Sequence, residues 1–185
     1  GAAAAYSGVF RGDASRWRLD GSVDLIDAEL LSYRAQRLGG PLNVRVRPGR
    51  MDLDGDLRAR GGSTAGIVGS LLGTTPRLSF EALRQADGAV LLERVSLTGQ
   101  AVTLTGSGGR TLVGGLGFRG RADITDAARL SPKAGGRFGG TVSASMARNG
   151  AAWQLRFDGR GRGLTTGMAE MDRLLGSAPR LQLTG

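Results

Sequence analysis

The residue types that most often carry out chemistry are scarce in this chain. It has no histidine and no cysteine, and Lys133 is its only lysine. Zinc sites built from cysteine and histidine, thiol nucleophiles and triads with a histidine base are therefore excluded. Lys133 lies in Ser131-Pro132-Lys133 rather than in a glycine-rich phosphate loop, which excludes a P-loop. The sequence predicts that the protein is not an enzyme and uses no cofactor.

Two charged segments resemble ligand sites, but neither has the full pattern. Asp52-Leu53-Asp54-Gly55-Asp56 resembles the start of a calcium loop, yet its glycine comes two positions early and the twelfth position is Ser63 instead of glutamate. Arg160-Gly161-Arg162-Gly163 resembles an RG tract, and the formal net charge is +9. Stacking on nucleic-acid bases needs aromatic residues exposed among the arginines, whereas Trp17 and Phe80 fall on apolar strand positions. We expect neither a metal nor a nucleic acid.

Strict alternation of apolar and polar residues dominates the chain. Clear examples are Leu42–Arg47 and Trp153–Asp158, and about fourteen such runs occur. A period of two is typical of half-buried strands. Dipeptides that favour tight hairpins stand between many runs: Asp20-Gly21, Asp54-Gly55, Asp87-Gly88, Asn149-Gly150 and Asp158-Gly159. The pattern predicts a mostly antiparallel all-β fold.

The apolar positions of the alternating runs are the candidate lining of a binding surface. They are Trp17, Leu19, Val23, Leu25, Leu42, Val44, Val46, Met51, Leu53, Leu57, Leu78, Phe80, Val95, Leu97, Val102, Leu104, Phe118, Ile124, Val142, Met146, Trp153, Leu155, Phe157, Leu181 and Leu183.

Two short segments have helical spacing instead. Apolar residues recur three to four positions apart over residues 64–72 and again over residues 166–175. A glycine follows each segment, Gly73 or Gly176, and then a proline, Pro76 or Pro179. Glycine favours the position after a helix and proline cannot continue one. We therefore expect two short helices.

The two helical segments belong to an internal duplication. Leu71-Leu72-Gly73-x-x-Pro76-Arg77-Leu78 recurs at positions 174–181, and Gly21-x-x-Asp24-Leu25-x-Asp27-Ala28 recurs at positions 120–127 with isoleucine in place of leucine. Gly39-Gly40 likewise aligns with Gly139-Gly140, and Asp54-Gly55 with Asp158-Gly159. A repeat of ~100 residues suggests an extended array. The predicted division is a partial preceding strand region at 1–15, one repeat at 16–115 and a truncated second repeat at 116–185.

From about Trp17 onward the chain resembles the TamB family, the inner-membrane subunit of the translocation and assembly module, and AsmA-like bridge proteins in general. The residues that carry the resemblance are Gly120-Arg121-Ala122-Asp123-Ile124, Ala134-Gly135-Gly136-Arg137-Phe138-Gly139-Gly140 and Leu174-Leu175-Gly176-Ser177-Ala178-Pro179-Arg180-Leu181. The order of hairpins followed by a small helix is similar to that family as well.

The resemblance implies a fold, a location and a function. The fold would be one long antiparallel sheet folded lengthwise into an apolar-lined groove, a β-taco. The chain would be an internal periplasmic part of a protein anchored in the inner membrane of a Gram-negative bacterium. It would carry phospholipids, with their acyl chains in the groove, between the inner and outer membranes. A TamA- or BAM-like outer-membrane barrel would bind elsewhere on the protein, and membrane contact would also lie outside this segment.

The residues alone leave two alternatives open. Half-buried strands need cover for their apolar face, which either a second sheet or a sheet curled on itself can provide; the repeat favours the curled sheet. The cargo could instead be unfolded strands of outer-membrane barrels, for which the same fold would act as a scaffold. Arginines near the rim, such as Arg45, Arg47, Arg58 or Arg156, would face either phosphate groups or only solvent. The longest run without charge, Gly61–Pro76, is too short to span a bilayer, so we expect this segment to be soluble.

Overall fold

The computed structural model describes residues 3–30, 32–168, 170, 172–173, 176 and 179–184. Within these ranges the chain is predominantly β and forms one open antiparallel sheet of eleven strands. The strands are β1 (Ala3–Gly12), β2 (Trp17–Leu30), β3 (Tyr33–Arg47), β4 (Arg50–Ser63), β5 (Arg77–Gln85), β6 (Val90–Thr98), β7 (Val102–Arg110), β8 (Leu116–Ile124), β9 (Gly135–Met146), β10 (Gln154–Thr165) and β11 (Arg180–Thr184).

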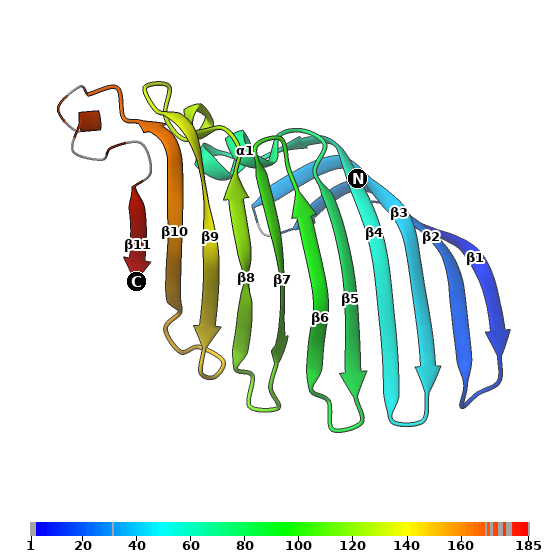
Figure 1. The fold of residues 1–185 in the computed structure, drawn as a ribbon. Coiled ribbons are helices and arrows are strands. Elements are labelled where there is room, and N and C mark those ends of the chain that lie inside the picture. The colour runs from blue at the N-terminus through cyan, green and yellow to red at the C-terminus, as the bar shows by residue number, and fades with distance from the viewer. Residues whose placement is uncertain are drawn as a thin grey trace.

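The sheet is a simple meander in which every strand pairs with the next strand along the chain. Figure 1 shows the strands side by side in sequence order, with the far halves of the longer strands β2 to β4 bending away behind the rest. The predicted antiparallel all-β class and the single sheet are therefore confirmed.

The strands are fewer and longer than the alternating runs predicted, because three of the expected turns lie inside strands. Gly21 in β2 pairs with Gly8 and Leu42, Gly55 in β4 pairs with Leu42 and Phe80, and Gly159 lies within β10. The predicted turns at Asp20-Gly21, Asp54-Gly55 and Asp158-Gly159 are thus wrong. These glycines have extended backbones, and their role is to leave space above the sheet. Asp87-Gly88 and Asn149-Gly150 do form turns, with positive φ at both glycines.

One of the two predicted helices lies in the described part. It is α1 (Gly66–Leu72), and it ends at Gly73, whose φ is 69°. The sequence did not predict the short 3-10 helix η1 (Ala127–Arg129), where the Asp126 side chain accepts a hydrogen bond from the Ala128 N–H. The second predicted helix, at 166–175, falls partly outside the described residues. Among those described, Asp172 N–H donates to the Met168 carbonyl, and Asp172 and Arg173 are helical.

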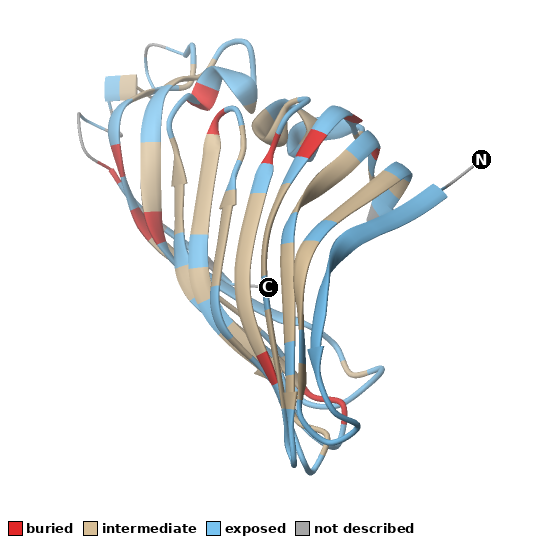
Figure 2. Ribbon diagram, turned by 90° about the vertical axis from the view of Figure 1, so that its right-hand side faces the viewer, coloured by how far each residue is buried: buried red, intermediate tan, exposed pale blue. Residues whose placement is uncertain are grey.

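Neither face of the sheet is covered by a second layer in the described part of the chain. Both α1 and η1 lie at the upper end of the strands in Figures 1 and 2. The only hydrophobic residues buried in the described part of the chain are Ala35, Ala59, Leu83, Ala101 and Ala127. No large side chain described in the structure is fully enclosed. A chain of this length normally has a closed core, so the absence of one makes the two faces of the sheet the places to look for function.

Candidate functional site

The strand register places one continuous apolar row across the sheet. Directly paired residues of antiparallel strands project from the same face. Successive pairing connects Phe10, Leu19, Val44, Leu53, Ala82, Leu92, Gly108, Phe118, Ala144 and Leu155, one residue from each strand from β1 to β10. This row and the residues at successive steps of two along each strand, with one extra residue at the irregularity between Leu92 and Val95 of β6, make up what we call the apolar face. The opposite side is the polar face.

Almost all of the candidate lining residues lie on the apolar face. Trp153 is an exception because it lies one residue before β10. Leu181 and Leu183 are not assigned to a face, because their side chains are not among those that the structure describes. The backbones of Leu181 and Leu183 pair with Gly159 and Phe157. Trp153 and Leu155 are exposed, while the other described members of the set are half-buried.

The register adds apolar residues that the sequence did not single out. They are Tyr6, Phe10, Leu38, Ala82, Val90, Leu92, Leu116, Ala122, Phe138 and Ala144. Several stand next to glycine or at an irregularity, where alternation is hard to follow. The β6 bulge near Glu93, for example, shifts the parity between Leu92 and Val95.

Aromatic rings on the apolar face lie over glycines of their own or the neighbouring strand. A Cβ added at Gly55 would come within 2.7 Å of the Phe80 ring, and one at Gly106 within 2.6 Å of the Phe118 ring. Phe157 lies over Gly159 of its own strand, and Tyr6 lies over Gly8 of its own strand and Gly21 of the neighbouring strand. The rings therefore lie along the sheet instead of standing up from it. In many β-sheets an aromatic ring packs over a nearby glycine. Here this packing keeps the rings flat against the sheet and leaves the space above the apolar face free.

The register places two arginines, Arg84 and Arg110, on the apolar face. Arg84 pairs with Val90 across β5 and β6, and Val90 pairs with Arg110 across β6 and β7. Both lie at the hairpin end of their strands and are exposed. Neither forms an ion pair or side-chain hydrogen bond with the described residues. The sequence analysis missed them, although a basic residue at an apolar position of an alternating run is a signal that can be read from the sequence.

The polar face is a network of arginine–aspartate pairs. Arg37 donates two hydrogen bonds of 2.6 Å to Asp24, and Arg180 donates bonds of 2.8 and 3.3 Å to Asp158. Arg77 makes an equivalent two-bond contact with Asp56. Hydrogen bonding to these arginines holds the pKa of each of the three carboxyl groups below its usual value. The four arginines proposed for the rim, Arg45, Arg47, Arg58 and Arg156, all project from this face.

The three carboxylates of the acidic run in β4 already bind other side chains of the same chain. Asp52 pairs with Arg47 and Arg50, Asp54 accepts a hydrogen bond from Asn43, and Asp56 pairs with Arg77. No cluster of three acidic side chains suited to a metal occurs among the described residues.

Comparison of the chain with protein-family models, curated proteins and solved structures finds no match. Within the described part, none of the helices has the length and apolar character that crossing a bilayer requires.

Proposed function

We propose that the apolar face binds the acyl chains of phospholipids, and that the chain is an internal segment of a TamB- or AsmA-like bridge protein that carries phospholipids between the inner and outer membranes. The observation that carries the proposal is the apolar face itself. It extends across ten strands, its large side chains are half-buried at most, and no second layer covers it in the described residues. Figure 2 shows how few positions along the strands are buried.

An exposed apolar surface of this extent needs an occupant. Monomeric proteins rarely expose contiguous apolar patches beyond a few hundred Å², and larger ones mark interaction sites. Each methylene removed from water contributes about 0.8 kcal/mol. A phospholipid with about 30 methylenes would therefore gain up to about 24 kcal/mol by leaving water. A curled sheet that shields hydrocarbon on several sides recovers much of this, and the headgroup can remain in water.

The dimensions of the sheet suit such a ligand. Eleven strands are separated by ten steps of about 4.8 Å, so the sheet extends about 48 Å from strand to strand, and a trough along it would have that length. One leaflet of a bilayer has a hydrocarbon depth of about 15 Å, half of the usual ~30 Å. A trough of this length accommodates an acyl chain with room for movement along the strand-to-strand direction.

Matching contacts in the two halves of the sheet support the repeat. Ala59 N–H donates to the Pro76 carbonyl, and Gly161 N–H donates to the Pro179 carbonyl, both at 2.9 Å. The Asp56–Arg77 contact corresponds in the same way to the Asp158–Arg180 contact. This register makes Asp56, and not Asp54, the counterpart of Asp158. In an array of such units each would lengthen the trough of the one before.

The test is mass spectrometry of an organic extract of the chain, expressed in a bacterium and purified without detergent. We expect phospholipid in near-stoichiometric amount. An extract containing no phospholipid, from protein whose circular dichroism is that of a β-sheet, would contradict lipid carriage.

The alternative, a scaffold for outer-membrane barrel strands, is favoured by the free edge of β1. Among the described residues β1 pairs with β2 alone, and every residue from Ala3 to Gly12 is exposed. An unpaired edge offers main-chain hydrogen bonds to an incoming strand. Crosslinks from β1 to an unfolded barrel protein, together with an extract without lipid, would favour this alternative.

A further inference from the structure

The polar face has two hollows that lie at corresponding places in the two halves of the sheet. The first hollow, of about 550 Å³, is lined by residues of β1 to β4, among them Asp24, Arg37, Arg58 and Arg60. The second hollow, of about 700 Å³, is lined by residues of β8 to β10, among them Arg137, Arg160 and Arg162. Neither takes part in the acyl-chain site proposed above, which is on the other face.

The same three arginine positions occur in both hollows. In the first, Gly39 pairs with Asp24 on one side and Arg58 on the other, and Arg37 pairs with Arg60. In the second, Gly139 pairs with Asp123 and Arg160, and Arg137 pairs with Arg162. The glycine at the centre of each group has no side chain of its own. The Asp24 carboxylate stands beside Gly39, and the Asp123 carboxylate lies over Gly139.

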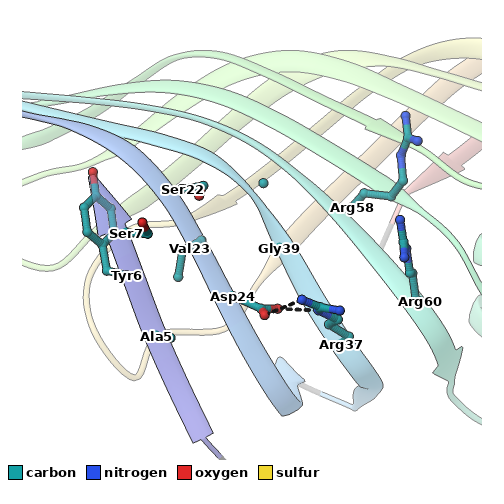
Figure 3. Close-up of a pocket in the computed structure, with 11 residues that line it drawn as sticks. Ala5, Tyr6, Ser7, Ser22, Val23, Asp24, Arg37, Gly39, Arg58 and Arg60 are labelled. Carbon is teal, nitrogen blue, oxygen red and sulfur yellow. Dashed lines mark hydrogen bonds and ion pairs between the residues drawn. The ribbon is translucent and has the colours of Figure 1, made fainter. Parts of the chain in front are cut away.

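The arginines of the hollows are only partly neutralised. Three arginines face one aspartate in the first hollow, and four arginines face two aspartates in the second. Each hollow therefore has two positive charges in excess. Figure 3 shows Arg37 turned to Asp24, while Arg58 and Arg60 extend from β4 with no hydrogen bond or ion pair to the other residues drawn. In the described part of the chain Arg58, Arg60, Arg137, Arg160 and Arg162 form no ion pair.

We propose that each hollow binds one phosphate group, so that the chain has two phosphate sites on the polar face. Guanidinium groups recognise phosphate through paired N–H···O bonds, and each hollow has at least two guanidinium groups that form no ion pair with the described residues and can provide such donors. The sites are six strands apart, which is about 29 Å. A small phosphate ligand cannot reach both, so the sites bind separately. The proposal is independent of lipid carriage on the apolar face.

Isothermal titration of the chain with pyrophosphate at low ionic strength tests the stoichiometry. We expect two ions per chain, and one for each of the double variants Arg58→Gln/Arg60→Gln and Arg160→Gln/Arg162→Gln. The matched control is Arg45→Gln/Arg156→Gln, which removes two positive charges from the same face outside both hollows and should still bind two. Circular dichroism of each variant confirms that the sheet is retained.

Sedimentation with vesicles distinguishes the source of the phosphate. One set of vesicles contains phosphatidylglycerol and phosphatidylcholine, and the other contains phosphatidylcholine alone. Binding to the anionic vesicles that falls at least threefold in the hollow variants, but not in the control, assigns the sites to lipid headgroups; binding of pyrophosphate alone assigns them to a soluble phosphate. The proposal is overturned if neither probe shows a loss that is specific to the hollow variants.

Discussion

Arg84 and Arg110 are the residues whose position says most about the ligand of the apolar face. Both project beside Val90 from that face, near the hairpin ends of β5 to β7. An unpaired guanidinium at the border of an apolar surface can contact a phosphate that remains in water while the attached hydrocarbon lies on the sheet. These two residues therefore predict a preference for anionic over zwitterionic headgroups.

Replacing both residues should weaken that preference. We expect Arg84→Gln/Arg110→Gln to lower the ratio of bound phosphatidylglycerol to bound phosphatidylcholine about tenfold, the factor that corresponds to about 1.4 kcal/mol. The measurement is lipid mass spectrometry after incubation with an equimolar mixture of the two. The variant Arg45→Gln/Arg156→Gln has the same net charge and should retain the preference. An equal change in both variants would mean that net charge, and not these positions, sets the ratio.

At the level of the strands, the pairing of aromatic rings with glycines decides the shape of the apolar face. Phe80 lies over Gly55 of the neighbouring strand, and the Phe118 ring lies over Gly106 of the neighbouring strand and over Gly120, the residue that pairs with Gly106. If these glycines had side chains, the rings would stand away from the sheet and occupy the space above it. The glycines within the strands thus serve both the bending of the sheet and the openness of its surface.

Gly55→Ala tests this arrangement. The new methyl group would meet the Phe80 ring at about 2.7 Å, so we expect a loss of about 1–3 kcal/mol in the free energy of unfolding, as for other overpacked sites. In a Phe80→Ala background the same change should be almost neutral, because the ring is gone. Urea denaturation of the four proteins gives the coupling.

Gly117→Ala is the matched control, since a Cβ there has open space within 4 Å. It should leave the stability within about 0.5 kcal/mol of the wild type. If Gly55→Ala costs no more than Gly117→Ala, the ring does not depend on the glycine beneath it.

At the scale of the whole molecule, the apolar face and the polar face are on opposite sides of one sheet. A substitution on one face can therefore leave the other face unchanged. Val44 and Arg45 are neighbours in β3, but Val44 belongs to the central apolar row and Arg45 to the polar face. Because neither face is closed by a second layer in the described residues, a charge placed on the apolar face can still be solvated. Such a variant should fold yet lose its affinity for hydrocarbon.

We expect Val44→Arg to abolish crosslinking of a phospholipid with a photoactivatable acyl chain, and Leu155→Arg to do the same. Arg45→Ala should leave the crosslinking yield within about twofold of the wild type, since a change of that size corresponds to less than about 0.5 kcal/mol. Wild-type crosslinking in a folded Val44→Arg protein would place the acyl chains somewhere other than the apolar face.

The sequence by itself determined the class of fold, the division of residues between two faces and the absence of histidine and cysteine chemistry. Alternation with a period of two is a local property, because each side chain's face follows from its neighbours on the same strand. The helix at 64–72 could also be predicted, since spacing and its terminal glycine are local signals. The same signals failed at Gly21, Gly55 and Gly159, where an aspartate–glycine pair that favours a turn lies inside a strand.

Only the tertiary structure decided which residues share a row, because register depends on the pairing of strands far apart in the sequence. It connected Phe10 to Leu155 across ten strands, placed Arg84 and Arg110 on the apolar face and brought Arg37 beside Arg60. It also left the sheet without a covering layer in the part described. Alternation predicts that a strand has an apolar side, but the arrangement of the other elements decides whether protein covers that side or leaves it for a ligand.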